Sequence, residues 1–316
     1  MVVSRLMSIS NSAGLAAMEL RLPPLETGSF RNSEEMIRFL APSMRKIVFA
    51  VALAAAAAGG VYLINPPYKA FKISSRILGE KRAILEYLPA GYHTSGKSYP
   101  VLFHLDADPR PSAYGPSFYT IAEKMNALGA PIPEMIVLGL TNTDRTRDMI
   151  PVPDTAFPPS PGKAHEFLQF ITEELIPDVE ARYRVTDLRI LYGRSDSGLF
   201  ALYALTAAPD AFQAIIASSP SLGRSPAFMA EAVKKLFRER PALAKTLFVV
   251  YGANEGPSVA DRVPEFAALI KKTCPENFIL GVKSIPGGGH VPRSSLEEGI
   301  RFLFGAPAHQ EGCPRY

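Results

Sequence analysis

Short apolar runs recur along this chain with helical stretches between them, and this alternation restricts the fold more than any other feature. The runs are nearly continuous in apolar character, as in strands buried on both faces of a sheet. They cover residues 100–105, 135–140, 189–192, 214–217 and 246–251, with a weaker run at 278–284. Apolar residues at helical spacing mark the stretches 163–183, 198–208, 226–238, 259–272 and 294–304.

Two further expected strands, residues 71–75 and 82–88, flank the turn at Gly79-Glu80 near the start of this region. A short turn between strands indicates an antiparallel start, whereas repeated strand-helix units produce parallel strands. We therefore predict an α/β fold with a mostly parallel central sheet and helices on both faces. In such sheets, reactive groups gather in the loops at the carboxyl ends of the strands.

Composition restricts the functional classes. The 316 residues are 47% hydrophobic, enough for one large α/β domain or two small ones. The net charge is only +4 and no dense Lys/Arg run occurs, so we expect no nucleic-acid partner. No cysteine-histidine cluster suggests zinc. Cys274 and Cys313, the only cysteines, either pair in an oxidising compartment or remain two unrelated thiols.

An apolar segment in the N-terminal part carries a targeting signal. Arg45 and Lys46 precede a stretch without charge over residues 47–64, the pattern of an export signal, which is also about long enough to span a bilayer. We expect residues 44–64 to be a signal peptide or a membrane anchor, and the protein to be exported, periplasmic or membrane-anchored. Either Met44 is the true initiator or residues 1–43 are an N-terminal extension without a role in chemistry.

The remaining boundaries follow from this segment. We expect a linker at residues 65–70, a single α/β domain at 71–306 and a C-terminal tail at 307–316. The oligomeric state is left open.

A candidate nucleophile lies in the stretch LYGRSDSGLF, residues 191–200. Ser195 follows an expected strand and precedes an expected helix, the context of the strained turn called a nucleophile elbow. Such a turn needs small residues two positions before and two after the serine. Gly193 meets the first need, and Ser197, slightly larger than glycine, meets the second. An ordinary helix N-cap is the alternative reading of the same residues.

Two later loops supply an acid and a base. Glu255 follows the expected strand 246–251, and His290 lies in a glycine loop after the expected strand 278–284. A serine hydroxyl needs an adjacent base to become a good nucleophile, and the histidine needs a carboxylate to fix its tautomer. We predict a triad of Ser195, His290 and Glu255, with Asp261 as the alternative acid.

An oxyanion hole requires two backbone N–H groups. We expect one from Asp196, the residue after the nucleophile, and one from the loop after residues 100–105, with Asp108 as the first choice. Both donors belong to aspartates, whose carboxylates would oppose a developing oxyanion if they turned into the site. We expect Asp196 to lie along the helix N-terminus instead, where negative charge is favourable.

From about Phe71 to Phe304 the chain resembles the esterase family of α/β hydrolases that includes siderophore, feruloyl and acetylxylan esterases, S-formylglutathione hydrolase and mycolyltransferases. The stretches that carry the resemblance include YPVLFHLDAD, TNTDRTRDMIP, FLQFITEELIPDVEARYRV, SDSGLFALYAL, GANEG and PGGGH. It implies an α/β-hydrolase fold and cofactor-free ester hydrolysis. By position, Ser195 resembles the family's nucleophile, Glu255 its acid and His290 its base.

The chain departs from the family pattern at three positions. Arg194 and Ser197 replace the histidine and glycine that usually flank the nucleophile, and Ala107 replaces a glycine of the oxyanion loop. Arg145, Arg147 and Asp148 also resemble a family stretch, and we interpret them as a structural ion-pair network.

We therefore expect a serine carboxylic-ester hydrolase that acts on a small-molecule ester through an acyl-enzyme. Two alternatives stay open at this point. One is an acyltransferase of the same fold, and the other is a catalytically silent binding protein. If residues 47–64 are retained, the membrane is a further partner.

Overall fold

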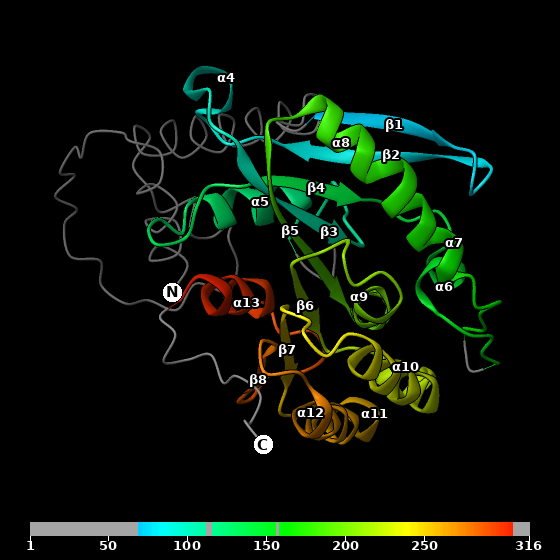
Figure 1. Ribbon diagram of the computed structural model, residues 1–316. Helices are drawn as coiled ribbons and strands as arrows, with labels where there is room; N and C mark the ends of the chain where they lie inside the picture. The colour runs from blue at the N-terminus through cyan, green and yellow to red at the C-terminus, as the bar shows by residue number, and fades with distance from the viewer. Residues whose placement is uncertain (1–68, 112–115, 156–157, 306–316) are drawn as a thin grey trace, which may run out of the picture. The chain divides into compact units, whose positions relative to one another are not determined.

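The computed structural model describes residues 69–111, 116–155 and 158–305, and an eight-stranded sheet organises this part of the chain (Figure 1). The strands are β1 (Lys69–Ser75), β2 (Glu80–Tyr87), β3 (Tyr99–Leu105), β4 (Ile136–Leu140), β5 (Val185–Arg194), β6 (Ala214–Ser218), β7 (Thr246–Gly252) and β8 (Ile279–Ile285). Their order is β1-β2-β4-β3-β5-β6-β7-β8. β2 pairs antiparallel with β1 and β4, and all other neighbours are parallel.

Helices cover both faces of this sheet. They are α4 (Tyr92–Ser95), α5 (Phe118–Asn126), α6 (Arg145–Met149), α7 (Ala164–Gln169), the π-helix η2 (Phe170–Leu175), α8 (Ile176–Arg182), α9 (Asp196–Ala207), the 3-10 helix η3 (Leu222–Arg224), α10 (Pro226–Glu239), α11 (Pro257–Ala260), α12 (Arg262–Thr273) and α13 (Ser295–Phe304). Figure 1 shows α5 and α13 on one face, with α8, α9 and α10 on the other. The predicted α/β fold with a mostly parallel sheet is confirmed.

The central strands are apolar at nearly every position because helices bury both of their faces. Every residue of β3, β4 and β6 is buried. Side chains alternate between the faces of a strand, so Val101 and Phe103 pack in the core beneath α9, whereas Leu102 packs with α5 and α13. Period-two alternation is therefore hidden in the sequence of these strands.

The long helix expected at residues 163–183 is three segments: α7, the single wide turn η2 and α8. Pro177 stands in the first turn of α8. Proline lacks the N–H that an α-helix would donate to the carbonyl four residues earlier, and its ring crowds that carbonyl. The wide π-turn just before Pro177 accommodates this defect without ending the helix.

Some other element boundaries differ from the expected ranges, and some elements were not predicted. β1 begins at Lys69, so the expected linker at 65–70 overlaps it by two residues. The short helices α4 and α6 and the nine-residue α5 were not expected from the sequence. Ser117 caps α5 by accepting a hydrogen bond from the Thr120 N–H.

The N-terminal targeting segment, residues 44–64, lies outside the described residues, as do residues 1–43 and 307–316. Within the described ranges, no helix combines the length and apolar character needed to cross a membrane. Cys274, just after α12, is disulfide-bonded, and Cys313 lies outside the described part of the chain.

Candidate active site

Ser195 lies in the turn between β5 and α9, with φ 57° and ψ −120°. A positive φ is strained for a residue with a side chain, and such strain is often found at functional positions. The turn is held by the Ser195 N–H, which donates to the Ser218 carbonyl at 2.8 Å, and by the Ser195 carbonyl, which accepts from the Leu199 N–H at 3.0 Å. A Cβ at Gly193 would lie 2.0 Å from the Ser197 carbonyl oxygen, so only glycine fits at that position.

His290 approaches Ser195 from the loop after β8. Its Nε2 atom lies 3.0 Å from the Ser195 Oγ atom. The imidazole side chain is 54% exposed, so the ring is accessible from solvent while it contacts the serine. The structure thus brings the expected nucleophile and base within hydrogen-bond distance.

Glu255 lies on the opposite side of the imidazole, in the loop after β7. Its Oε2 atom is 2.6 Å from His290 Nδ1, and its Oε1 atom accepts a hydrogen bond from the Gly252 N–H at 2.7 Å. The Glu255 side chain is only 1% exposed. Asp261, the alternative acid, is exposed, and no described hydrogen bond joins it to His290.

The acid loop and the histidine loop are joined through their backbones. The Ala253 N–H donates to the Ile285 carbonyl at 3.0 Å, and the Asn254 N–H donates to the Gly288 carbonyl at 2.9 Å. A Cβ at Gly252 would lie 2.3 Å from the carbonyl oxygens of Gly288 and Gly289. Glycine at position 252 therefore permits the close approach of the two loops.

Two backbone N–H groups near Ser195 could stabilise a negative charge by donating hydrogen bonds to it. Asp196 is the first residue of α9, and Asp108 lies in the loop after β3 and lines the same cavity as Ser195. Among the described residues, neither the Asp196 N–H nor the Asp108 N–H has an acceptor, whereas the N–H of Ala107, directly before Asp108, donates to the Leu140 carbonyl at 3.1 Å. Both expected oxyanion donors are thus at the site, and their role stays a prediction.

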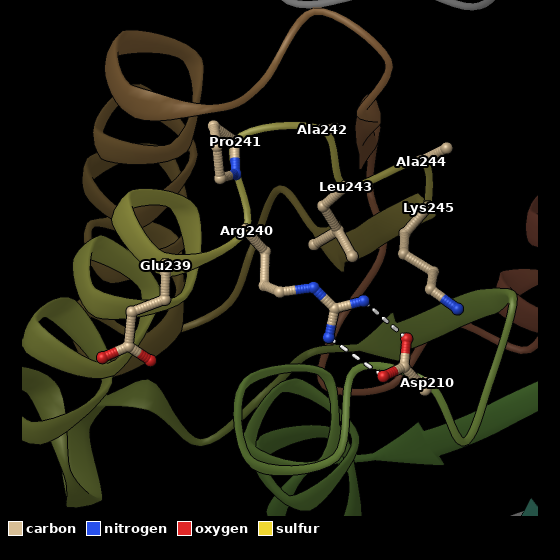
Figure 2. Close-up of a pocket in the computed structure, with 8 residues that line it drawn as sticks. All are labelled: Asp210, Glu239, Arg240, Pro241, Ala242, Leu243, Ala244 and Lys245. Carbon is tan, nitrogen blue, oxygen red and sulfur yellow. Dashed lines mark hydrogen bonds and ion pairs between the residues drawn. The ribbon is translucent and has the colours of Figure 1, made fainter.

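The cavity beside Ser195 and His290 has a volume of about 920 Å³. Three arginines, Arg145, Arg194 and Arg293, contribute to its lining. A smaller hollow of about 390 Å³ lies at the opposite, amino-terminal edge of β7. Figure 2 shows Arg240 facing Asp210 there, with both guanidinium Nη atoms bonded to the carboxylate. Its lining residues include no serine or histidine, so the chemistry-bearing residues point to the larger cavity.

Comparison with known proteins identifies the family. The model of the family described as "Putative esterase" matches residues 75–255, more than half of the chain. The chain belongs to this esterase family. The IroE-like serine hydrolase from Shewanella oneidensis has a similar structure, with a TM-score of 0.66 and 30% identity over 75% of this chain and 80% of that one. The BES protein from Bacillus cereus, at 22% identity and a TM-score of 0.66 over 77% of this chain and 96% of that one, shares the fold.

Curated relatives match parts of this chain. Ferri-bacillibactin esterase BesA of Bacillus subtilis (strain 168) is 34% identical over 146 residues, 39% of this chain and 48% of that protein. Siderophore triacetylfusarinine C esterase of Aspergillus fumigatus is 42% identical over 80 residues, 25% of this chain and 27% of that protein. The matched part therefore spans less than half the length of each of these relatives.

Arg145 pairs with the carboxylates beside Ser195. Its guanidinium donates to Asp106 from Nε at 3.1 Å and Nη2 at 3.0 Å, and to Asp196 from Nη1 at 2.7 Å. Burial alone would raise the pKa of Asp106, but the charge of Arg145 and hydrogen bonds from Arg145, Ser197 and Asn142 outweigh it and lower the pKa. The aspartate charges that would oppose an oxyanion are thus paired with a cation.

The stretch around Arg145 is divided between two networks. Arg147 and Asp148 form the expected structural ion pair, at 2.7 Å, and both also pair with residues of β2, Glu80 and Arg82 respectively. Arg145 also belongs to an ion-pair network, but this one borders the cavity beside Ser195. All three residues therefore take part in ion pairs, and those of Arg145 lie beside the cavity that Ser195 lines.

Ser197 occupies the position where the family usually has glycine. Its side chain is buried, its Oγ accepts from the Arg194 N–H at 2.8 Å, and its hydroxyl lies 2.7 Å from Asp106 Oδ2. The serine therefore fits as expected, and it also joins the nucleophile turn to the loop after β3.

Two serines after β6 were missed in the sequence. Ser219 Oγ lies 2.5 Å from Glu255 Oε1, and Ser221 Oγ lies 3.3 Å from Ser195 Oγ. Their position in the sequence could have indicated them. Polar residues directly after a buried parallel strand lie at the same sheet edge as Ser195, Glu255 and His290. Among the described residues, no cluster of three or more histidine, cysteine, aspartate or glutamate side chains could hold a metal ion.

Proposed function

We propose that this protein is a serine esterase that cleaves carboxylic esters through an acyl-enzyme formed on Ser195. The observation that carries the proposal is the continuous chain of hydrogen bonds from Ser195 Oγ through His290 to Glu255, at 3.0 Å and 2.6 Å. The strained turn at Ser195 and the family membership support it. Three residues from three separate loops, each in reach of the next, are the arrangement that an activated serine requires.

The reaction starts with attack by Ser195 Oγ on the ester carbonyl carbon. His290 Nε2 takes the hydroxyl proton as the Oγ–carbon bond forms, and Glu255 stabilises the imidazolium through its hydrogen bond to Nδ1. The tetrahedral intermediate collapses, the bond to the alcohol oxygen breaks, and His290 gives its proton to that oxygen. A water molecule then attacks the acyl-enzyme, His290 takes and returns a proton in the same way, and the free acid leaves.

The negative charge that develops on the carbonyl oxygen needs donors that are already in place. We assign this role to the N–H groups of Asp196 and Asp108. Asp196 is at the N-terminus of α9, where the helix dipole adds a favourable partial charge. Because Arg145 holds the Asp106 and Asp196 carboxylates, these side chains do not cancel that effect.

The proposed substrates are esters of siderophores. Relatives that match parts of the chain are named for esters of this class: ferri-bacillibactin, triacetylfusarinine C and enterobactin. A cavity of about 920 Å³ beside Ser195 lies near the upper end of the range typical of small-molecule sites, roughly 300–1,000 Å³. Arg194 and Arg293 on its wall would favour an acidic ligand.

We further propose that residues 44–64 export the protein or anchor it to a membrane, on the basis of the basic residues followed by an uncharged apolar stretch. Mass spectrometry of the mature protein from membrane and periplasmic fractions tests this. A membrane-bound form that retains residues 47–64 would be an anchored protein, and a soluble form lacking them would be an exported one. A soluble cytoplasmic form that retains the segment would contradict both.

Ester hydrolysis by the wild type and by Ser195→Ala tests the proposed activity. We expect the wild type to release free acid from p-nitrophenyl acetate and from siderophore esters. Ser195→Ala should lower kcat by at least about 10³-fold, whereas Ser258→Ala, at an exposed serine in α11, should retain wild-type turnover. Activity of Ser195→Ala at the wild-type level would overturn the proposal.

A further inference from the structure

Ser218, the last residue of β6, and the loop 219–221 that follows it contact both Ser195 and Glu255 of the proposed triad. The Ser218 carbonyl accepts from the Ser195 N–H, the Ser221 hydroxyl is 3.3 Å from Ser195 Oγ, and the Ser219 hydroxyl contacts Glu255. Of these contacts, the one made by Ser219 is to Glu255, at the opposite end of the hydrogen-bond chain from Ser195. Its role follows from the direction of its hydrogen bonds.

Ser219 Oγ has two neighbours, Glu255 Oε1 at 2.5 Å and the Val291 N–H at 3.0 Å. A backbone N–H can only donate, and an ionised carboxylate can only accept. Both directions are therefore fixed: Ser219 accepts from Val291 and donates its single hydroxyl proton to Glu255. A charged acceptor makes this a strong hydrogen bond.

The two neighbours belong to the two loops that must stay in register. Val291 directly follows His290, and Glu255 holds His290 Nδ1 through its other oxygen, Oε2. The Ser219 hydroxyl therefore closes a ring that runs through Glu255, His290 and the Val291 backbone. Oε1 of Glu255 has one other described donor, the Gly252 N–H at 2.7 Å.

The backbone of Ser219 is held in an unusual conformation to reach this place. Its φ is 45°, and its N–H donates to the Val250 carbonyl at 2.7 Å. A non-glycine residue at positive φ costs about 1–3 kcal/mol unless its surroundings compensate for it. Ser219 is also completely buried, at 0% exposure. Here the strain places a buried hydroxyl between the acid and the loop that carries the base.

We infer that Ser219 is a positioning residue for the triad, acting through Glu255 and the His290 loop and not on the substrate. The inference rests on the proposed esterase function. Without the hydroxyl, Glu255 keeps one donor on Oε1 and the Val291 N–H loses its acceptor. Both changes loosen the His290 ring relative to Ser195, so they lower the rate of the chemical step and leave substrate binding unchanged.

Steady-state kinetics in two backgrounds provide the first test. We expect Ser219→Ala to lower kcat for p-nitrophenyl acetate about tenfold, from the loss of a hydrogen bond to a charged group, with KM unchanged within about twofold. In a Glu255→Gln background, the same substitution should change kcat by less than about twofold, because residues that act as a unit are non-additive.

Two variants separate the hydroxyl from general structural effects. Ser219→Gly removes both the hydroxyl and the strain at positive φ, and we expect it to lose as much kcat as Ser219→Ala. Ser295→Ala removes an equally buried hydroxyl, at 0% exposure, which is bonded to Ser218 and Pro292 outside the triad. It should lower the urea midpoint and retain kcat. Wild-type kcat in Ser219→Ala, or the same fractional loss in both backgrounds, would overturn the inference.

A spectroscopic arm distinguishes this failure from failure of the proposed function. The His290 Nδ1 proton bonded to Glu255 should give a downfield proton NMR resonance that does not depend on turnover. We expect Ser219→Ala to shift or broaden this resonance and Ser295→Ala to leave it in place. If the wild type hydrolysed no ester, the esterase proposal would fail. An unchanged resonance in Ser219→Ala would overturn the positioning role of Ser219 itself.

Discussion

His290 Nδ1 and Glu255 Oε2 lie 2.6 Å apart, and the two side chains differ sharply in exposure. The Glu255 side chain is 1% exposed and the His290 side chain is 54% exposed. The buried carboxylate is restrained by its other donors, whereas the exposed imidazole is open to a substrate and to water. This division suits a base that must exchange protons while its orientation stays fixed.

The assignment of the acid is tested by comparing two substitutions. Glu255→Gln removes the negative charge that stabilises the imidazolium and selects its tautomer, so we expect kcat to fall by about 10²–10⁴. Asp261→Asn should leave kcat within about twofold, because Asp261 is exposed and makes no described contact with His290. Hydrolysis of p-nitrophenyl acetate measures both. The reverse pattern would make Asp261 the acid.

Removal of Arg145 leaves two buried carboxylates without their main cation. We expect Arg145→Gln to destabilise the fold by about 2 kcal/mol, less than a fully buried pair because the Arg145 side chain is 35% exposed. It should also lower kcat, since the Asp106 and Asp196 charges then oppose the oxyanion. Adding Asp196→Asn should recover part of the rate. Urea unfolding and ester hydrolysis measure these effects, and unchanged values for both in Arg145→Gln would refute this role.

A glycine at position 197 restores the usual family spacing, yet we expect it to weaken this protein. Ser197→Gly removes the acceptor of the Arg194 N–H and a donor to the buried Asp106 carboxylate. The expected loss is about 1–3 kcal/mol in the free energy of unfolding. Urea denaturation measures it. Equal or greater stability of Ser197→Gly would show that the serine is only a tolerated substitute.

His104, on β3, gives a stability that depends on pH. It packs against Phe118 and Tyr192, and neither ring nitrogen has a partner among the described residues. Burial, together with the nearby charge of Arg194, lowers its pKa from 6.5 to about 3 against the opposing effect of Asp106. The unfolded chain therefore protonates His104 below about pH 6.5, whereas the folded chain keeps it neutral. The contribution of His104 to the free energy of unfolding is fully present above pH 6.5 and is lost as the pH falls toward 3.

The expected slope from this residue is at most about 1.4 kcal/mol per pH unit. Because carboxylates titrate in the same range, the measurement is a difference between the wild type and His104→Leu. Urea unfolding at a series of pH values from 7 to 4 should show a shallower loss for the leucine variant. Parallel curves for the two proteins would mean that His104 does not have a depressed pKa.

The strands could be predicted because helices cover both faces of the sheet, so that apolar runs such as residues 135–140 and 246–251 are uninterrupted. Structural details that depend on one local defect could not be predicted. The wide turn η2 is explained by Pro177 only once the chain is known to continue as a helix past it. The helix α5 has buried residues at helical spacing, Phe118, Ala122 and Met125, so its signal was present in the sequence and was missed.

The close placement of Ser195, Glu255 and His290 could be predicted because each follows an expected strand, and parallel strands bring their carboxyl ends to one edge. The contacts of Ser219 and Arg145 could not be predicted from the sequence. They depend on side-chain directions and on a backbone with φ 45° at Ser219, which no spacing rule conveys. Residues that hold a site are therefore harder to read from sequence than residues that form it.

Covalent labelling of Ser195 tests the central claim most directly. A fluorophosphonate reacts only with an activated serine, and peptide mass spectrometry locates the adduct. We predict a single adduct on the peptide that contains Ser195 in the wild type, and at least about 10²-fold slower labelling in His290→Ala because the base is absent. No labelling of the wild type, labelling at another serine, or an undiminished rate in His290→Ala would contradict the account.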